Sequence, residues 1–317
     1  MEFVLWDMGI GLVSGSGMFF LFLCAGMAIA LEIAYNSSSH VFTNNRTSLR
    51  MHMKMEHKNR DGNRVLENGR LVYYKEKATR EFWERLWSQY TKPDFYKPYQ
   101  EGHLFEFEKI FNRHLPASGK ILEAGCGTAQ LVLALSAKGY DCYGLDYTLE
   151  TLRNTQNLVG PLRLLSGDLH AIAVPDGAFD AIISIGVVEH NYLGPEKILK
   201  EMTRVLKKGG VMLISVPYFN SLRKWRADHG AYQDDVLGLE FYQYAFSRRE
   251  FSDFIVSCGY EIEAVYSYSH QKTLSEELHW LKRVPASLRK LIMRLSKYVP
   301  YVNSDLGHML MVIARKR

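Results

Sequence analysis

Acidic side chains stand at the ends of three predicted strands, at a spacing that suits the binding of a nucleoside. Glu123 ends an apolar run that begins at residue 121, Asp146 follows residues 140–145, and Asp168 follows residues 162–165. Asp146 lies about 20 residues past a glycine turn, where nucleotide-binding folds place a carboxylate that accepts hydrogen bonds from a ribose diol. Glu123 would be costly to bury at a strand end without a cationic partner, which favours a role in binding a ligand.

The turn after the first strand carries two glycines, Gly125 and Gly127. Glycine permits a positive φ and lets a ligand approach the backbone closely. The helix that follows would offer free N–H groups and the positive end of its dipole. Many turns of this kind bind no ligand, so the prediction of a binding site depends on the acidic residues at the neighbouring strand ends.

The elements that must position these groups alternate between strand and helix. Further strands are predicted at 179–186 and 211–217, and helices at 128–138, 148–158 and 195–206, with Thr148 as an N-cap. This alternation predicts a doubly wound parallel sheet with helices on both faces. Ligands of such sheets bind beyond the carboxyl ends of the strands, where all three acids lie.

The order of these motifs resembles the class I S-adenosylmethionine-dependent methyltransferases of the type 11 kind. The resemblance covers residues 121–218 and departs from the family pattern at Ala129, which replaces a third glycine. It implies an α/β, Rossmann-like fold with a seven-stranded, mostly parallel sheet. Strands at 261–268 and 308–314 would form the antiparallel hairpin that closes the sheet, and S-adenosyl-L-methionine would be the cofactor.

The resemblance also implies which residues bind that cofactor. Asp146 would hold the ribose, Asp168 with the backbone of Leu169 the adenine, and Glu123 the ammonium group. The remaining predicted contacts are Gly125, Cys126, Gly127, Tyr147 and Ile185.

Methyl transfer is an in-line displacement, so alignment of the acceptor is the main task of the protein. A general base is optional and depends on the pKa of the acceptor. His190, which follows the fourth strand, is the candidate base; the alternative is that it only shapes the pocket, as Glu-His pairs do in similar methyltransferases.

Two other functions remain open from the sequence. A Rossmann-type NAD(P)-dependent oxidoreductase would use the same glycine turn and Asp146, although the third glycine and a second βαβαβ half are missing. A membrane scaffold could bind the cofactor without turnover. The acceptor is predicted to be a small molecule, a glycan or a lipid-linked compound. A nucleic-acid substrate is not expected, because residues 215–218 only distantly echo the Asn/Asp-Pro-Pro-aromatic motif.

The N-terminal region predicts a membrane anchor. Residues 8–31 contain no charged side chain and are long enough to cross a bilayer as a helix. The predicted organisation is an anchor at 1–34, a basic juxtamembrane linker at 35–77 and a methyltransferase domain at 78–317. Positive charges after the anchor predict a single-pass protein with a cytoplasmic catalytic domain. A cleaved signal peptide is the alternative, because Ala28-Ile29-Ala30 offers a small-x-small site.

Two further helices carry distinctive patterns. An aromatic stripe begins near residue 78 (Phe82, Trp83, Leu86, Trp87 and Tyr90). It indicates a core face, and a lid over the cofactor, as a leading helix forms in similar methyltransferases, is the alternative. Residues 281–299 predict a basic amphipathic helix that lies on a membrane or covers part of the substrate cleft.

Composition bounds these interpretations. The chain has 317 residues, and its 47% hydrophobic content is ample for a sizeable core. The net charge of +5 is mild and is no nucleic-acid footprint by itself. The four cysteines form no C-x-x-C pair, so reduced thiols and no metal site are expected.

Overall fold

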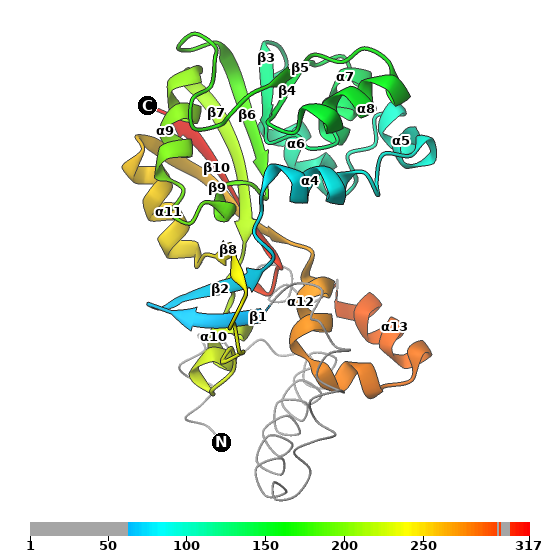
Figure 1. Ribbon diagram of the computed structural model, residues 1–317, viewed down its shortest axis with the longest axis vertical. Coiled ribbons are helices and arrows are strands. Elements are labelled where there is room, and N and C mark those ends of the chain that lie inside the picture. Colours follow the sequence, from blue (N-terminus) through cyan, green and yellow to red (C-terminus); the bar gives the residue numbers. More distant parts are fainter. Residues whose placement is uncertain (1–62, 297, 299–304) are drawn as a thin grey trace, which may run out of the picture. The chain divides into compact units, whose positions relative to one another are not determined.

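A seven-stranded sheet forms the centre of the domain (Figure 1), in the order β5-β4-β3-β6-β7-β10-β9. The five strands from β5 to β7 are parallel, and β10 pairs antiparallel with both β7 and β9. The strands are β3 (Lys120–Ala124), β4 (Asp141–Asp146), β5 (Leu164–Ser166), β6 (Phe179–Ile185), β7 (Leu206–Pro217), β9 (Tyr260–Tyr268) and β10 (Met309–Lys316). The predicted topology, including the closing hairpin, is confirmed.

Helices cover both faces of this sheet, with α9 and α11 on one side and α6, α7 and α8 on the other (Figure 1). These helices are α6 (Glu108–His114), α7 (Gln130–Ala137), α8 (Leu149–Val159), α9 (Glu196–Val205) and α11 (Arg248–Ser257). Successive strand residues point to opposite faces, so the strands divide their apolar residues between two cores. In β3, for example, Leu122 packs with α9 residues while Ile121 packs with α7 residues.

The computed structural model describes residues 63–296, 298 and 305–317. The predicted anchor, residues 1–34, lies outside these residues, as does the linker up to residue 62. Among the described residues, no helix is long and apolar enough to cross a membrane. The short 3-10 helix η3 (His279–Arg283) belongs to a separate unit of the chain from the one that holds the sheet.

A second, three-stranded sheet corrects the predicted linker of residues 35–77. Strands β1 (Asn63–Glu67) and β2 (Arg70–Lys75) form a hairpin, and β2 pairs antiparallel with β8 (Glu240–Ala245). The turn is Asn68-Gly69, and both residues have positive φ. Such an Asn-Gly pair is the strongest short-range signal for a two-residue hairpin, so the sequence did contain the feature that the linker assignment overlooked.

A buried ion cluster connects this small sheet to the rest of the domain. Glu277, fully buried in α12 (His270–Glu277), accepts hydrogen bonds from Arg64 of β1 at 2.6 Å and from Arg223 of α10 (Ser221–Asp228) at 3.0 Å. The Tyr232 hydroxyl donates to the other Glu277 oxygen at 2.8 Å. Arg223 also donates to the carbonyl of Tyr218, which follows β7. The cluster therefore fixes β1, α10 and α12 against the end of the large sheet.

Several predicted boundaries change in detail. The aromatic stripe lies on α4 (Arg80–Trp87), and a helix that was not predicted follows it, α5 (Pro93–Gln100). The predicted helix at 281–299 is shorter, because α13 spans Ala286–Ser296 after Pro285. Proline lacks the N–H that a helix interior needs, but it is tolerated at a helix start. Pro285 therefore explains why α13 begins at Ala286 and does not continue from residue 281.

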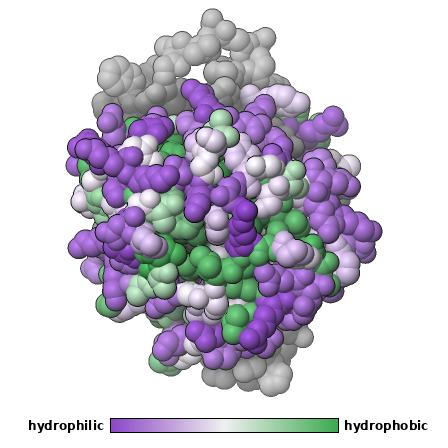
Figure 2. All heavy atoms as spheres, turned by 90° about the horizontal axis from the view of Figure 1, so that it is seen from above, coloured by the Kyte–Doolittle hydropathy of each residue, from purple (hydrophilic) through white to green (hydrophobic). Residues whose placement is uncertain are grey.

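Figure 2 shows the molecule from above. This is the end of the domain at which β6 and β7 begin in Figure 1. Hydrophilic side chains cover most of this face, with apolar side chains in a band across its middle. The predicted functional residues lie at the opposite, carboxyl ends of the parallel strands.

Candidate active site at the carboxyl ends of the strands

The turn after β3 packs closely against its neighbours. Gly125 has φ +81°, and a Cβ added there would lie 2.5 Å from the side chain of Val187, which follows β6. Gly127 has φ +50°, and its added Cβ would lie 3.1 Å from the ring of Trp87. Both positions therefore need glycine for their conformation and for close contact.

The N–H groups of the turn itself form hydrogen bonds within the protein. Gly125 and Cys126 both donate to the carbonyl of Leu145, at 2.8 and 3.0 Å, and Gly127 donates to Asp146. The Cys126 side chain is buried in the core, and burial raises the pKa of its thiol. The N–H groups of Gly125, Cys126 and Gly127 are therefore already engaged within the protein.

Asp146 ends β4 and is almost fully buried. One carboxylate oxygen accepts from the Gly127 N–H at 2.8 Å; the other accepts from the Thr148 N–H at 2.9 Å and the Thr148 hydroxyl at 2.6 Å. Thr148 is the N-cap residue of α8, as predicted, but its hydroxyl binds Asp146 rather than the helix. A carboxylate has about four acceptor positions, so a diol that binds Asp146 through both hydroxyls must displace one of these three bonds.

Glu123 lies on β3 and accepts the N–H of Val132 at 3.2 Å. Val132 is in the first turn of α7, whose N-cap residue, Ala129, has no side chain that could accept that bond. Burial raises the pKa of Glu123 to about 8, the hydrogen bond from Val132 opposes this, and the charge of Asp146 adds to it. Glu123 thus caps a helix and is also poised to ionise beside a cation.

Asp168 follows β5, and it accepts hydrogen bonds from the backbone and ring of His170, both at 2.8 Å. The other ring nitrogen of His170 is 3.0 Å from the amide nitrogen of Asn191, which follows β6. Leu169 packs against the core beside α9, and Gly167 donates to the Asp146 carbonyl at 3.0 Å. Asp168 therefore sits at the strand edge next to Asp146, with its side chain largely exposed.

Tyr147 and Ile185 lie at the same edge. The Tyr147 ring is half-buried beneath the guanidinium of Arg80 from α4, 5.6 Å from the ring centroid, and burial raises the pKa of its hydroxyl to about 12. Ile185 is the last residue of β6 and packs with the α7 core.

His190 is enclosed by aromatic rings. Trp83 of α4 and Tyr242 of β8 each lie 4.9 Å from it between ring centroids, both edge-on. Its Nδ1 is 2.7 Å from the carbonyl of Tyr242. A carbonyl only accepts, so Nδ1 carries the proton and Nε2 keeps a lone pair. Burial lowers the pKa of His190 to about 4, so the ring is neutral near pH 7.

Helix α4 lies over this edge, which corrects the expected core role of its aromatic stripe. Phe82 is buried, but Trp83 and Trp87 are only half-buried and contact His190 and Gly127 respectively. The two tryptophan rings stack with centroids 5.7 Å apart. The lid interpretation therefore describes Trp83 and Trp87 better than the core interpretation.

Glu189 is a buried acid beside the site that was not predicted from the sequence. Its side chain is 1% exposed, and burial raises its pKa to about 8. Its Oε2 has no hydrogen-bond partner among the residues that the structure describes. Its position directly before His190 was the available signal.

Comparisons with known proteins agree with this arrangement. Residues 122–214 match the family described as methyltransferase domain. The protein YqeM of Bacillus subtilis is 33% identical over 118 residues, which are 35% of this chain and 47% of that protein. Demethylmenaquinone methyltransferase of Bacillus mycoides is 27% identical over 186 residues, which are 56% of this chain and 78% of that protein.

A solved structure supports the fold. A chain from a complex that contains the Haloferax volcanii Trm112 methyltransferase activator superimposes with a TM-score of 0.51 at 16% identity, covering 75% of this chain and 97% of that one. The chain spans only about half the length of YqeM, so the family is assigned to the shared domain. The glycine turn, the acids at successive strand ends and these matches together assign this domain to the class I S-adenosylmethionine-dependent methyltransferases.

Proposed function

We propose that this protein transfers a methyl group from S-adenosylmethionine to a small-molecule acceptor. One observation carries the proposal: Glu123 and Asp146 lie together at the glycine turn, while His190 and two tryptophans of α4 lie beside the same turn. This arrangement offers acids to a cationic nucleoside and an aromatic wall to an acceptor.

The charges of the site suit this cofactor. When bound, S-adenosylmethionine supplies a methyl group on a positively charged sulfur. Glu123 and Glu189 are both buried with pKa values near 8, so each is mostly neutral at pH 7 without a cationic partner. A nearby positive charge favours the ionised form of a carboxyl group, so a cationic ligand would lower both pKa values and be held by the resulting charges. A neutral or anionic ligand gains nothing from this.

In this proposal, each residue of the site has a separate role in binding the cofactor or the acceptor. Asp146 would hold the ribose after giving up one of its protein hydrogen bonds, and Glu123 would hold the ammonium. Trp83 and Trp87 would exclude water and orient the acceptor. His190, with its neutral ring fixed by the Tyr242 carbonyl, would accept a hydrogen bond from the acceptor through Nε2. With a pKa of about 4 it is a weak base, so orientation is its main contribution.

We propose an acceptor with a ring system or an apolar portion. The acceptor side of the site is built from rings, Trp83 and Tyr242, with the ammonium of Lys75 5.3 Å from the Tyr242 ring centroid. Aromatic walls favour flat apolar groups. The Bacillus mycoides relative is named for demethylmenaquinone, which fits this class. A lipid-linked acceptor and a single-pass anchor at residues 8–31, with the catalytic domain in the cytoplasm, are part of the proposal and rest on the sequence.

Calorimetry with the purified chain tests the cofactor. We expect S-adenosylmethionine to bind and NAD to give no heat; the reverse would indicate the oxidoreductase. Transfer of a radiolabelled methyl group into a lipid and metabolite extract tests turnover, and binding without any labelled product would favour a scaffold. Extraction of cell membranes at alkaline pH tests the anchor, because a spanning helix keeps the chain in the pellet.

A further inference from the structure

Helix α13 presents a leucine stripe to solvent. Leu288, Leu291 and Leu295 are 49%, 50% and 44% exposed, and their spacing places them on one face of the helix. The opposite face holds Met293 and the buried Ser296. Tyr298, just past the helix, is 78% exposed. Four large apolar side chains within eleven residues leave an unusual amount of apolar surface in water.

The polar residues of this helix are all basic or neutral. Arg289, Lys290 and Arg294 are its charged residues, and the sequence from 279 to 298 contains no Asp or Glu. Among the residues that the structure describes, none of these three cations forms an ion pair. Arg294 lies in the last turn, where a cation stabilises the helix dipole, but Arg289 and Lys290 do not.

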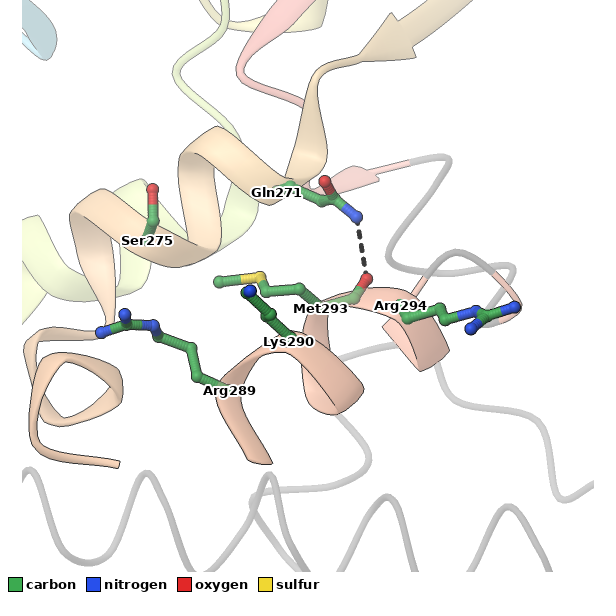
Figure 3. A pocket seen from close by; sticks show the side chains of 6 residues that line it. All are labelled: Gln271, Ser275, Arg289, Lys290, Met293 and Arg294. Carbon is green, nitrogen blue, oxygen red and sulfur yellow. Dashed lines mark hydrogen bonds between the residues drawn. The ribbon is translucent and has the colours of Figure 1, made fainter. Parts of the chain in front are cut away.

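A hollow of about 460 Å³ adjoins the helix, lined by Gln271, Ser275, Arg289, Lys290, Met293 and Arg294. Figure 3 shows Arg289 and Lys290 extending on the side of α12, while Arg294 extends away from them. The Gln271 amide donates to the Met293 carbonyl at 2.8 Å and ties α12 to α13. The hollow therefore offers hydrogen-bond donors and positive charge beside the leucine stripe, which suits a phosphate group.

We propose that α13 docks on an anionic lipid surface, with the leucines in the acyl boundary and the cations at the headgroup phosphates. Charge complementarity selects this partner. Nucleic acid would match the cations but not three exposed leucines, and an apolar protein surface would match the leucines but not the unpaired cations. A helix with a basic polar side and leucines opposite its protein contacts is typical of interfacial binding. The proposal does not depend on methyl transfer.

Hydrogen–deuterium exchange of the full-length chain, with mass spectrometry, tests the proposal. With phosphatidylserine-containing vesicles, we expect the amides of α13 to exchange more slowly than with pure phosphatidylcholine vesicles. Replacing Lys290 and Arg294 by Gln should weaken this vesicle-dependent protection, by about fivefold in lipid affinity for each lost charge. Leu291→Asp should abolish it. The readout is local, so an anchor elsewhere in the chain cannot produce it.

Val256→Asp is the matched control, because Val256 is 46% exposed on α11, a helix that also carries Glu250 and Asp253. This variant should keep the protection of α13. Equal protection by neutral and anionic vesicles, or none by either, would overturn the proposal. So would protection without vesicles that is lost when residues 1–62 are deleted, because the helix face would then be covered by the chain itself.

Discussion

Two groups of acids are buried in this domain, and burial has opposite consequences in them. In the ion cluster, Glu277 is fully buried; although burial acts to raise its pKa, the charges of Arg64 and Arg223 hold the pKa below its ordinary value. At the strand edge, Glu123 and Glu189 are buried almost as deeply, and burial raises both pKa values to about 8. The groups therefore differ in their partners and not in their burial.

This difference separates an acid that has its cation from acids that lack one. A buried carboxylate is costly unless it is paired and hydrogen-bonded. Arg64, Arg223 and Tyr232 supply Glu277 with that environment within the chain itself. Within the described part of the chain, Glu123 accepts one backbone N–H, and one oxygen of Glu189 has no hydrogen-bond partner. We infer that a cationic ligand supplies the partner that Glu123 and Glu189 lack. The difference between the two groups of acids can be tested by experiment.

The largest expected effect comes from Glu277→Gln. The change keeps the shape of the side chain but removes the counter-charge of the buried Arg64, and it leaves Arg223 with Glu276 as its carboxylate partner. Removing one partner of a buried pair costs about 3–5 kcal/mol of unfolding free energy. Urea unfolding of the variant against the wild-type chain measures this.

Glu189→Gln is the matched control for the cluster, since it is equally isosteric and buried. Glu189 is mostly protonated at pH 7 in the folded chain but ionised in the unfolded chain, where its ordinary pKa is 4.5. Gln removes the cost of taking up that proton, so we expect the unfolding free energy of this variant to rise, by up to about 3 kcal/mol, and not to fall. If both variants lost the same stability, the two groups of acids would not differ as the comparison requires.

Asp146→Ala should have the next largest effect, on cofactor binding. It removes the proposed acceptor for the ribose and releases the N–H of Gly127. Hydrogen bonds to a charged group contribute about 1.5–3 kcal/mol, so affinity should fall by about 10- to 100-fold. Calorimetric titration with S-adenosylmethionine checks this, and Asp176→Ala, at an exposed aspartate, is the control. Unchanged affinity would remove Asp146 from the proposed site.

The parallel sheet could be predicted from the sequence because its signals are local. The strands β3, β4, β5 and β6 are short runs that end in, or are followed at once by, an acid or a glycine. A helix follows within a few residues of several of them, as α7 follows Glu123. The acids that the sequence singled out do lie at one edge of the sheet, because the carboxyl ends of parallel strands meet there. Their use of protein hydrogen bonds could not be predicted, since it depends on distances between loops.

The three-stranded sheet escaped prediction because its pairing is not local. Strand β2 pairs with β8, whose Ala245 lies opposite Leu71, far apart in the sequence. Only the Asn68-Gly69 turn gave a local sign of the hairpin. The lid role of α4 was hidden for a similar reason: an aromatic stripe looks the same whether it faces a core or a site, and only the contact of Trp83 with His190 distinguishes them.

The pH dependence of stability should have opposite signs for the two groups. Glu123 and Glu189 hold a proton in the folded chain up to about pH 8, whereas their ordinary pKa is 4.5. The cofactor-free chain should therefore lose unfolding free energy as pH rises through this window, by at most about 1.4 kcal/mol per pH unit for each acid. For Glu277 the folded pKa is lowered, so its contribution is present above 4.5 and is lost as pH falls through the folded pKa.

Urea unfolding across this pH range tests both signs. Between pH 5 and pH 8, the double variant Glu123→Gln, Glu189→Gln should lose less unfolding free energy than the wild-type chain. Added S-adenosylmethionine should make the unfolding free energy of the wild-type chain less dependent on pH, because the cofactor favours the ionised acids. If unfolding free energy depended on pH in the same way in the double variant and in the wild type, neither acid would hold a proton in the folded chain up to about pH 8.

The smallest expected effect is that of Ala129→Gly, which separates the loop backbone from the acid that caps α7. Ala129 has φ 56° and ψ 31°, a left-handed conformation that costs a residue with a Cβ about 1–2 kcal/mol. Glycine relieves this cost, but it loses a buried methyl contact of about 0.8 kcal/mol and gains about 0.5–1 kcal/mol of unfolded-state entropy. These contributions nearly cancel, so unfolding free energy should change by less than about 1 kcal/mol. Cofactor affinity should stay within about twofold, because Glu123 keeps its bond to Val132. A large loss of affinity would mean that the Ala129 backbone, and not the Glu123 carboxyl, sets the geometry of the site. Glu189 would then be the one strand-edge acid that still supports the difference between the two groups of acids.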